Sequence, residues 1–151
     1  MSPLQIKILR LLFWACWAGT LFLYIPCLFS CTLTRIGGPL VLALVAGLCF
    51  TCAALVRRVP QLARLGMLTL GLPAAFILVM VLPVPETYDN GHSDRGFDLV
   101  LVGFFFGVTV CLGSAFSSKC FPALSRIGMI ILGILFGAFC LAATYYAALG
   151  G

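Results

Sequence analysis

Charged residues are scarce in this sequence. Only 9% of the 151 residues are charged, and the chain contains four acidic residues and one histidine. Soluble domains carry about 25% charged residues, so this composition excludes an ordinary water-soluble fold. The formal net charge is +5. The basic residues stand at the ends of apolar runs and form no separate patch, so we expect no nucleic-acid partner.

The apolar runs themselves contain no charged side chain and no histidine. A proton-coupled antiporter needs a titratable group in its pathway. An intramembrane protease places a Ser–His pair or two aspartates inside its bundle. Neither set of groups is present in these runs. The sequence therefore predicts a protein that is not an enzyme and that has no catalytic residue, cofactor or metal ion.

Apolar residues are abundant, at 63% of the chain with a mean hydropathy of +1.20. Five apolar runs are each about as long as the ~20 residues that a helix needs to cross a bilayer. We therefore predict an all-α fold, a polytopic integral membrane helix bundle in which residues 1–151 form one domain. The five predicted transmembrane helices are residues 11–31, 39–56, 67–84, 99–116 and 127–149.

The basic residues predict the orientation of these five helices. Seven of them fall on the side of the N-terminus and two on the opposite side. The first group is Lys7, Arg10, Arg57, Arg58, Arg64, Lys119 and Arg126, and the second is Arg35 and Arg95. Short basic loops stay in the cytoplasm. We therefore expect the N-terminus inside and the C-terminus outside, in a cell membrane such as the bacterial inner membrane.

Four pairs of small residues four positions apart stand out in the last four runs. Such a pair lies on one helix face, where a second backbone can approach closely. The pairs are Gly103 with Gly107, Gly133 with Gly137, Ala43 with Gly47, and Gly71 with Ala75. We expect the fourth and fifth helices to cross as an antiparallel pair through their glycine faces.

The eight cysteines allow three interpretations. Cys49 and Cys52 form a C-x-x-C motif, and Cys27 and Cys31 lie one helical turn apart. Membrane thiol oxidoreductases of the DsbB and vitamin K epoxide reductase type use such pairs at the outer face, whereas Cys49 and Cys52 fall in the inner half of their helix. The thiols could also pass a soft metal ion across the membrane. We favour a third interpretation, in which they are small apolar packing residues.

The only long polar stretch is residues 86–98, which contains all four acidic residues. We expect it to be an outer loop in which Asp89, His92, Asp94 and Arg95 recognise a partner. Their spacing matches no dedicated metal-binding loop.

Together these patterns predict a small non-enzymatic membrane protein that acts through helix–helix contacts. It would be an accessory subunit or an immunity-type partner of another membrane protein. Besides the lipid bilayer, its partner would be that protein or a second copy of itself. The alternatives are a small oligomeric transporter or pore former, holin-like or uniporter-like, and a membrane thiol redox or soft-metal-handling protein.

Overall fold

The described part of the chain is helical apart from short turns. The computed structural model describes residues 1–30, 37–81 and 107–149, and the side chains of all these residues except 26–30 and 73–81. It contains five helices, which confirm the all-α class. They are α1 (Pro3–Ser30), α2 (Gly37–Leu55), α3 (Pro60–Val81), the shorter helix Gly107–Ser117, and α5 (Pro122–Leu149).

Three of the helices are long and apolar enough to cross a membrane. They are residues 3–25 within α1, the whole of α2 and the whole of α5. The helix Gly107–Ser117 is apolar but shorter. These helices support a multi-pass membrane protein. The predicted spans 67–84 and 99–116 extend into residues outside the described ranges, so the total of five spans stays a prediction.

Several helices begin earlier than the apolar runs predict. The backbone N–H of Gln5 donates to Ser2 Oγ at 3.3 Å, and the backbone N–H of Ser2 donates to Gln5 Oε1 at 2.9 Å. This reciprocal cap starts α1 at Pro3 rather than at residue 11. Pro60 and Pro122 stand at the first positions of α3 and α5, where a missing N–H costs nothing. Polar first turns therefore lengthen these helices beyond their apolar cores.

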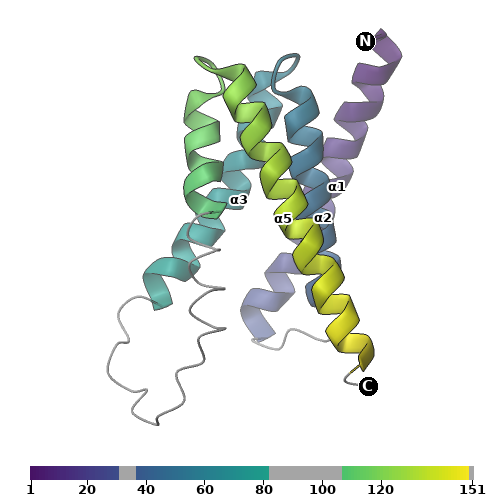
Figure 1. Ribbon diagram of the computed structural model, residues 1–151, viewed down its shortest axis with the longest axis vertical. Helices are drawn as coiled ribbons and strands as arrows, with labels where there is room; N and C mark the ends of the chain where they lie inside the picture. Colours follow the sequence, from purple (N-terminus) through teal and green to yellow (C-terminus); the bar gives the residue numbers. More distant parts are fainter. Residues whose placement is uncertain (31–36, 82–106, 150–151) are drawn as a thin grey trace.

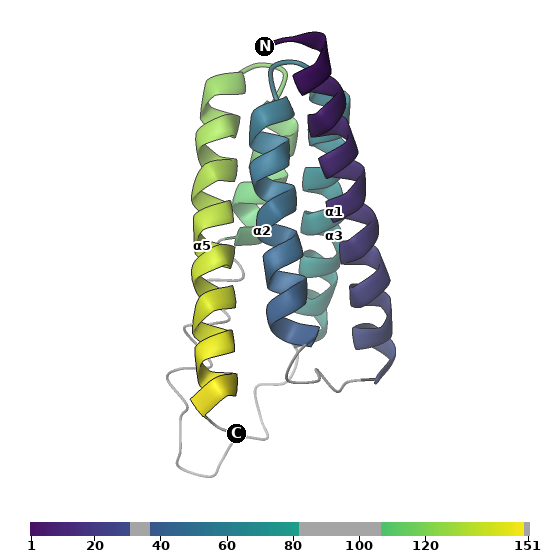
Figure 2. The ribbon, with the colours of Figure 1, turned by 90° about the vertical axis from the view of Figure 1, so that its right-hand side faces the viewer.

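The helices alternate in direction (Figures 1 and 2). Helices α1, α3 and α5 run from the end that holds the N-terminus, and α2 and Gly107–Ser117 run back towards it. The N-terminus, the turn at residues 56–59 and the turn at residues 118–121 therefore lie at one end, which we call the basic end. The C-terminus lies at the opposite end.

Helix α2 is the centre of the bundle. Its largest contact is with α5, followed by α1 and then α3. Figure 2 shows it between α5 and α1. Its apolar window is also buried to a greater extent than those of α1 and α5. The largest fully buried side chains come from four helices and meet around it: Phe13, Leu48, Leu55, Met67, Met129 and Leu132.

Candidate functional site

Glycines bring α2 and α3 close to their neighbours. A Cβ added to Gly47 of α2 would lie 3.1 Å from Cys16 Sγ of α1. A Cβ added to Gly71 of α3 would lie 3.0 Å from Leu112 Cδ2 of the helix Gly107–Ser117. Of the other members of these two predicted pairs, Ala43 is exposed, and the side chain of Ala75 lies outside the described residues.

Gly133 of α5 faces α2. A Cβ on Gly133 would lie 2.9 Å from Cε1 of the Phe50 ring, which fills the space that the missing side chain leaves. The sequence predicted that this glycine would face the fourth helix; its nearest described neighbour is Phe50 of α2, and the predicted partner Gly103 lies outside the described residues. The i, i+4 spacing correctly identifies a shared helix face but carries no information on which neighbour lies against it.

The helix Gly107–Ser117 packs on α5 through a different set of small residues. A Cβ on Gly107 would meet Leu132 Cδ2 at 3.6 Å, and a Cβ on Gly128 would meet Ser114 Oγ at 3.0 Å. The buried Ser125 hydroxyl donates to the Ser114 carbonyl oxygen at 3.1 Å and joins the two helices. Gly128 has no small residue four positions away on its helix, so no motif in the sequence pointed to it.

Gly137, the second glycine of the α5 pair, has different surroundings. No described atom lies within 4 Å of a Cβ built on it. The same is true of Gly113 on the exposed side of the helix Gly107–Ser117. Gly103 lies outside the described residues. Within the described chain, therefore, Gly133 is used in packing and Gly137 is open.

The thiols of the C-x-x-C motif are in the core. Cys49 and Cys52 are fully buried, and the Cys111 thiol from the helix Gly107–Ser117 lies near both. A Cβ on Gly66 of α3 would lie 2.5 Å from Cys52 Sγ, so this thiol occupies the space beside that glycine. Within the described residues no group of three or more Cys, His, Asp or Glu has an arrangement that could hold a metal ion. Cys31 and the side chain of Cys27 lie outside the described residues.

Three threonine hydroxyls of α1, α2 and α3 donate to carbonyl oxygens of their own helices. Thr20 and Thr51 each donate to the carbonyl oxygen four residues earlier, at 2.7 Å, and Thr69 donates to the Gly66 carbonyl oxygen at 2.9 Å. A cavity of about 150 Å³ lies between the helices, and most of its wall is apolar. It is lined by residues of all five helices: Thr20, Leu21, Tyr24, Val41, Leu42, Val45, Thr69, Leu70, Gly107, Val108, Cys111 and Phe136.

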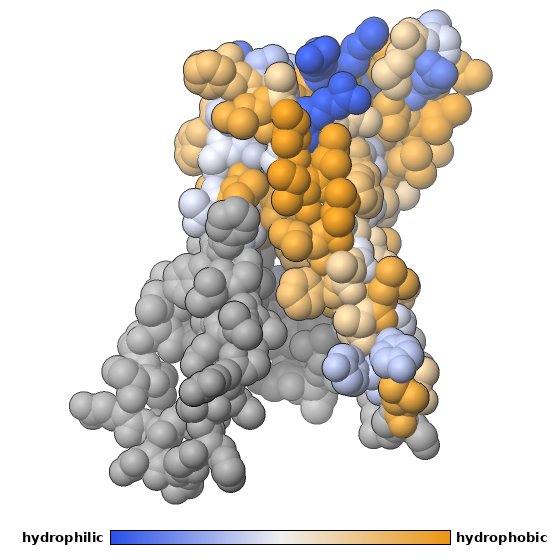
Figure 3. All heavy atoms as spheres, viewed as in Figure 1, coloured by the Kyte–Doolittle hydropathy of each residue, from blue (hydrophilic) through white to orange (hydrophobic). Residues whose placement is uncertain are grey.

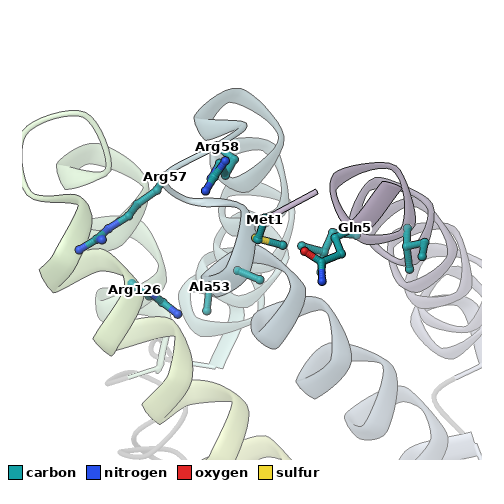
Figure 4. Close-up of a pocket in the computed structure, with 9 residues that line it drawn as sticks. Met1, Gln5, Ala53, Arg57, Arg58 and Arg126 are labelled. Atoms are coloured by element: carbon teal, nitrogen blue, oxygen red, sulfur yellow. The ribbon is translucent and has the colours of Figure 1, made fainter. Parts of the chain in front are cut away.

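Basic side chains gather at the basic end. All Lys and Arg residues of the described chain lie in its two turns or in the first turns of α1, α3 and α5, and Figure 3 shows hydrophilic atoms above a broad apolar surface. Three of them, Arg57, Arg58 and Arg126, line a pocket of about 540 Å³ (Figure 4). The sequence marked these arginines only as determinants of orientation. No local spacing relates Arg57 to Arg126, so only the fold could reveal the pocket.

The predicted recognition residues of the outer loop, Asp89, His92, Asp94 and Arg95, lie outside the described residues. Their role stays a prediction. No protein-family model matches the chain, and neither a curated protein nor a solved structure matches it.

Proposed function

We propose that this protein is a non-enzymatic, multi-pass membrane protein that binds another membrane protein through its helices, as an accessory subunit or an immunity-type partner. The observation that carries the proposal is the contrast between two glycines on α5. Phe50 of α2 covers Gly133, whereas no described atom lies within 4 Å of a Cβ on Gly137. Gly137 therefore offers a place where the backbone of a foreign helix can approach α5.

The neighbours of Gly137 have the form that such a contact requires. Ile134, Leu141 and Tyr145 share its face of α5, and 58%, 73% and 64% of their surfaces are exposed. Lipid tails are as apolar as leucine, so burial of apolar surface does not drive helix association in a membrane. Close packing drives it instead, and a glycine between protruding side chains permits close packing.

The alternatives have weaker support. An oligomeric transporter needs a polar path, whereas Thr20, Thr51 and Thr69 donate their hydrogen bonds to carbonyls of their own helices. A redox enzyme needs an accessible thiol pair, whereas Cys49 and Cys52 are fully buried. The apolar runs also contain no His, Asp, Glu, Lys or Arg, which supports a non-enzymatic role.

The proposal includes five membrane spans, with the basic end in the cytoplasm and the C-terminus outside. Its support is the distribution of basic residues, since short loops rich in Lys and Arg resist translocation. A bacterial inner membrane is the simplest location for a helical protein with this bias. The loop of residues 86–98 would then face outward and add to the partner contact.

The experiment compares Gly137→Leu with the matched control Gly133→Leu, because the two positions lie one helical turn apart on α5. Tagged proteins are expressed in the organism of origin, purified in a mild detergent and analysed by native mass spectrometry and thermal melting. We expect the wild-type protein to carry a foreign membrane protein in a fixed ratio. Gly137→Leu should lose this partner and melt normally, because no described atom lies within 4 Å of a Cβ at this position.

The control should behave differently. Gly133→Leu should melt at a lower temperature, because the new side chain and the Phe50 ring cannot occupy the same space. If the wild-type protein is instead a homo-oligomer and Gly137→Leu dissociates it, the partner is a second copy of the chain. This result would favour the transporter alternative. If Gly137→Leu both melts normally and keeps its partner, α5 is not the binding surface and the proposal fails.

A further inference from the structure

The pocket at the basic end combines cationic and apolar walls. Arg57 and Arg58 come from the turn between α2 and α3, and Arg126 comes from the first turns of α5. Its other walls are supplied by the start of α1 and the end of α2: Met1, Gln5, Ile8, Leu9, Ala53 and Ala54. In Figure 4, Arg126 and Gln5 lie on opposite sides of the pocket, with Ala53, Met1 and Arg58 between them.

The positive charge of this pocket is not neutralised within the described chain. All four acidic residues of the protein belong to residues 86–98, which lie outside the described ranges. The three arginines are exposed, so their guanidinium groups are available to a ligand. The carbonyl oxygen of the Gln5 side chain accepts the cap bond from Ser2, which leaves its amide N–H groups as further donors. The pocket therefore offers several donors and no acidic group of its own.

These donors suit a phosphate. A guanidinium group is planar, stays charged, and donates two parallel hydrogen bonds to a phosphate or a carboxylate. The volume of about 540 Å³ lies within the range of about 300–1,000 Å³ that is usual for small-molecule sites. Carbon-rich walls formed by Ile8, Leu9 and Ala53 would accommodate a ligand that is apolar at its other end.

The surroundings of the pocket favour a lipid over a soluble phosphate. Leu4, Ile8 and Leu12 project from α1 beside the pocket, with 65%, 49% and 48% of their surfaces exposed. This exposed apolar surface continues along a helix that is long enough to cross a membrane. A molecule that reaches the pocket along α1 is therefore a lipid of the surrounding bilayer.

We propose that this pocket binds the headgroup of an anionic phospholipid. The phosphate contacts Arg58 and Arg126. Arg57 adds positive charge at the edge of the pocket, where its side chain extends away from Gln5 (Figure 4), and the Gln5 amide donates to a headgroup or glycerol oxygen. The first carbons of an acyl chain lie along Ile8 and Leu9. The site is separate from the Gly137 face of α5, so neither proposal depends on the other.

A general attraction between basic residues and an anionic membrane is the competing explanation. Such an attraction would affect all basic residues of the basic end equally, whether or not they line the pocket. Lys7, Arg10 and Lys119 are equally exposed but do not line the pocket. The chain thus provides a control with the same change of net charge.

The experiment measures phosphatidylglycerol binding to the purified full-length protein in a neutral detergent by native mass spectrometry. Phosphatidylcholine, which carries a compensating cation, is the first comparison, and soluble glycerol 3-phosphate is the second. The pocket variant is Arg57→Gln/Arg58→Gln/Arg126→Gln, and the control variant is Lys7→Gln/Arg10→Gln/Lys119→Gln. Arg126→Lys is added because it keeps the charge and loses the paired hydrogen bonds.

We expect tight binding of phosphatidylglycerol and weak binding of phosphatidylcholine. Each charge-assisted contact between an arginine and a phosphate is worth about ten-fold in affinity, so the loss of these contacts should weaken binding to the pocket variant by on the order of 100-fold or more. The control variant should remain close to the wild-type protein, and Arg126→Lys should bind less tightly than the wild-type protein.

Three results would overturn the proposal. Equal losses in the pocket and control variants would show only a general attraction between opposite charges. Competition by glycerol 3-phosphate at the same concentration as the lipid would identify a soluble phosphate as the ligand. Absence of phosphatidylglycerol binding to the wild-type protein would leave the pocket without its proposed ligand. Thermal melting of the pocket and control variants in the same detergent separates a loss of binding from misfolding, and Arg126→Lys gives a second test with a single conservative change.

Discussion

The Phe50 ring of α2 lies over Gly133 of α5, so that a Cβ on this glycine would stand 2.9 Å from Cε1 of the ring. Phe50 is 46% exposed, and its outer edge therefore faces the surroundings of the bundle. This contact joins α2 to α5, with which α2 makes more extensive contact than with α1 or α3. It also gives Gly133 a role within the protein and separates it from Gly137.

We predict that Phe50→Ala will partly rescue Gly133→Leu. The single change Gly133→Leu should lower the free energy of unfolding by about 1–3 kcal/mol, because the leucine overpacks the site. Phe50→Ala removes the ring that the leucine would displace, so the double variant should be more stable than the sum of the single effects. Thermal melting of the four proteins in one detergent measures this coupling. Additive effects would show that the two residues do not compete for the same space.

We predict that Ser125→Ala will loosen the packing of the helix Gly107–Ser117 on α5. The substitution removes the 3.1 Å hydrogen bond from the buried Ser125 hydroxyl to the Ser114 carbonyl oxygen. The cost should be about 1 kcal/mol in the free energy of unfolding. Ser117→Ala is the control, because the Ser117 hydroxyl makes only a 3.5 Å contact within its own helix. Equal stability of the two variants would contradict a role for the hydrogen bond between the helices.

We predict that the buried thiols contribute to packing and not to chemistry. In the folded protein, Cys120 should react quickly with a maleimide, because it is exposed, whereas Cys49 and Cys52 should react only after unfolding. Cys49→Ser/Cys52→Ser should lower stability slightly and leave partner binding intact. Loss of binding at a normal protein level would instead favour the redox interpretation.

We predict the orientation from the basic residues. A reporter that is active only outside the cytoplasm should be active when fused after Gly151 or inserted near Asn90, and silent near Arg58. The physical reason is that the basic turn at residues 56–59 resists translocation. Activity at Arg58 would show that the basic end faces outward and would overturn the five-span arrangement.

Sequence reasoning predicted the helical class and the apolar cores of α1, α2 and α5, because long runs without charge allow few other structures in a membrane. It placed several helix starts too late. Each apolar run begins only after the first turns of its helix. The cap at Ser2 and the prolines at 60 and 122 start the helices before these runs. These start signals are local, and a search for them would have corrected the boundaries.

The neighbours of the glycines could not be predicted. Gly133 and Gly137 have the same local pattern, yet Phe50 covers one and no described atom covers the other. Gly66 lies against Cys52 and Phe13 although no small residue stands four positions from it. Spacing along one helix determines which residues share a face, whereas the partner of that face depends on how all the helices cross. The pocket at the basic end was missed for the same reason.

The central position of α2 has a consequence for the synthesis of the protein. Its largest contact is with α5, the last helix of the chain, and not with either sequence neighbour. Roughly 80 residues separate Phe50 from Gly133, so at about 5–20 residues per second α2 is made about 4–16 s before its main partner. During that interval, lipid or the insertion machinery must cover the face of α2 that α5 later occupies. A nascent chain that stops before α5 therefore presents this face to the quality-control proteases of the membrane.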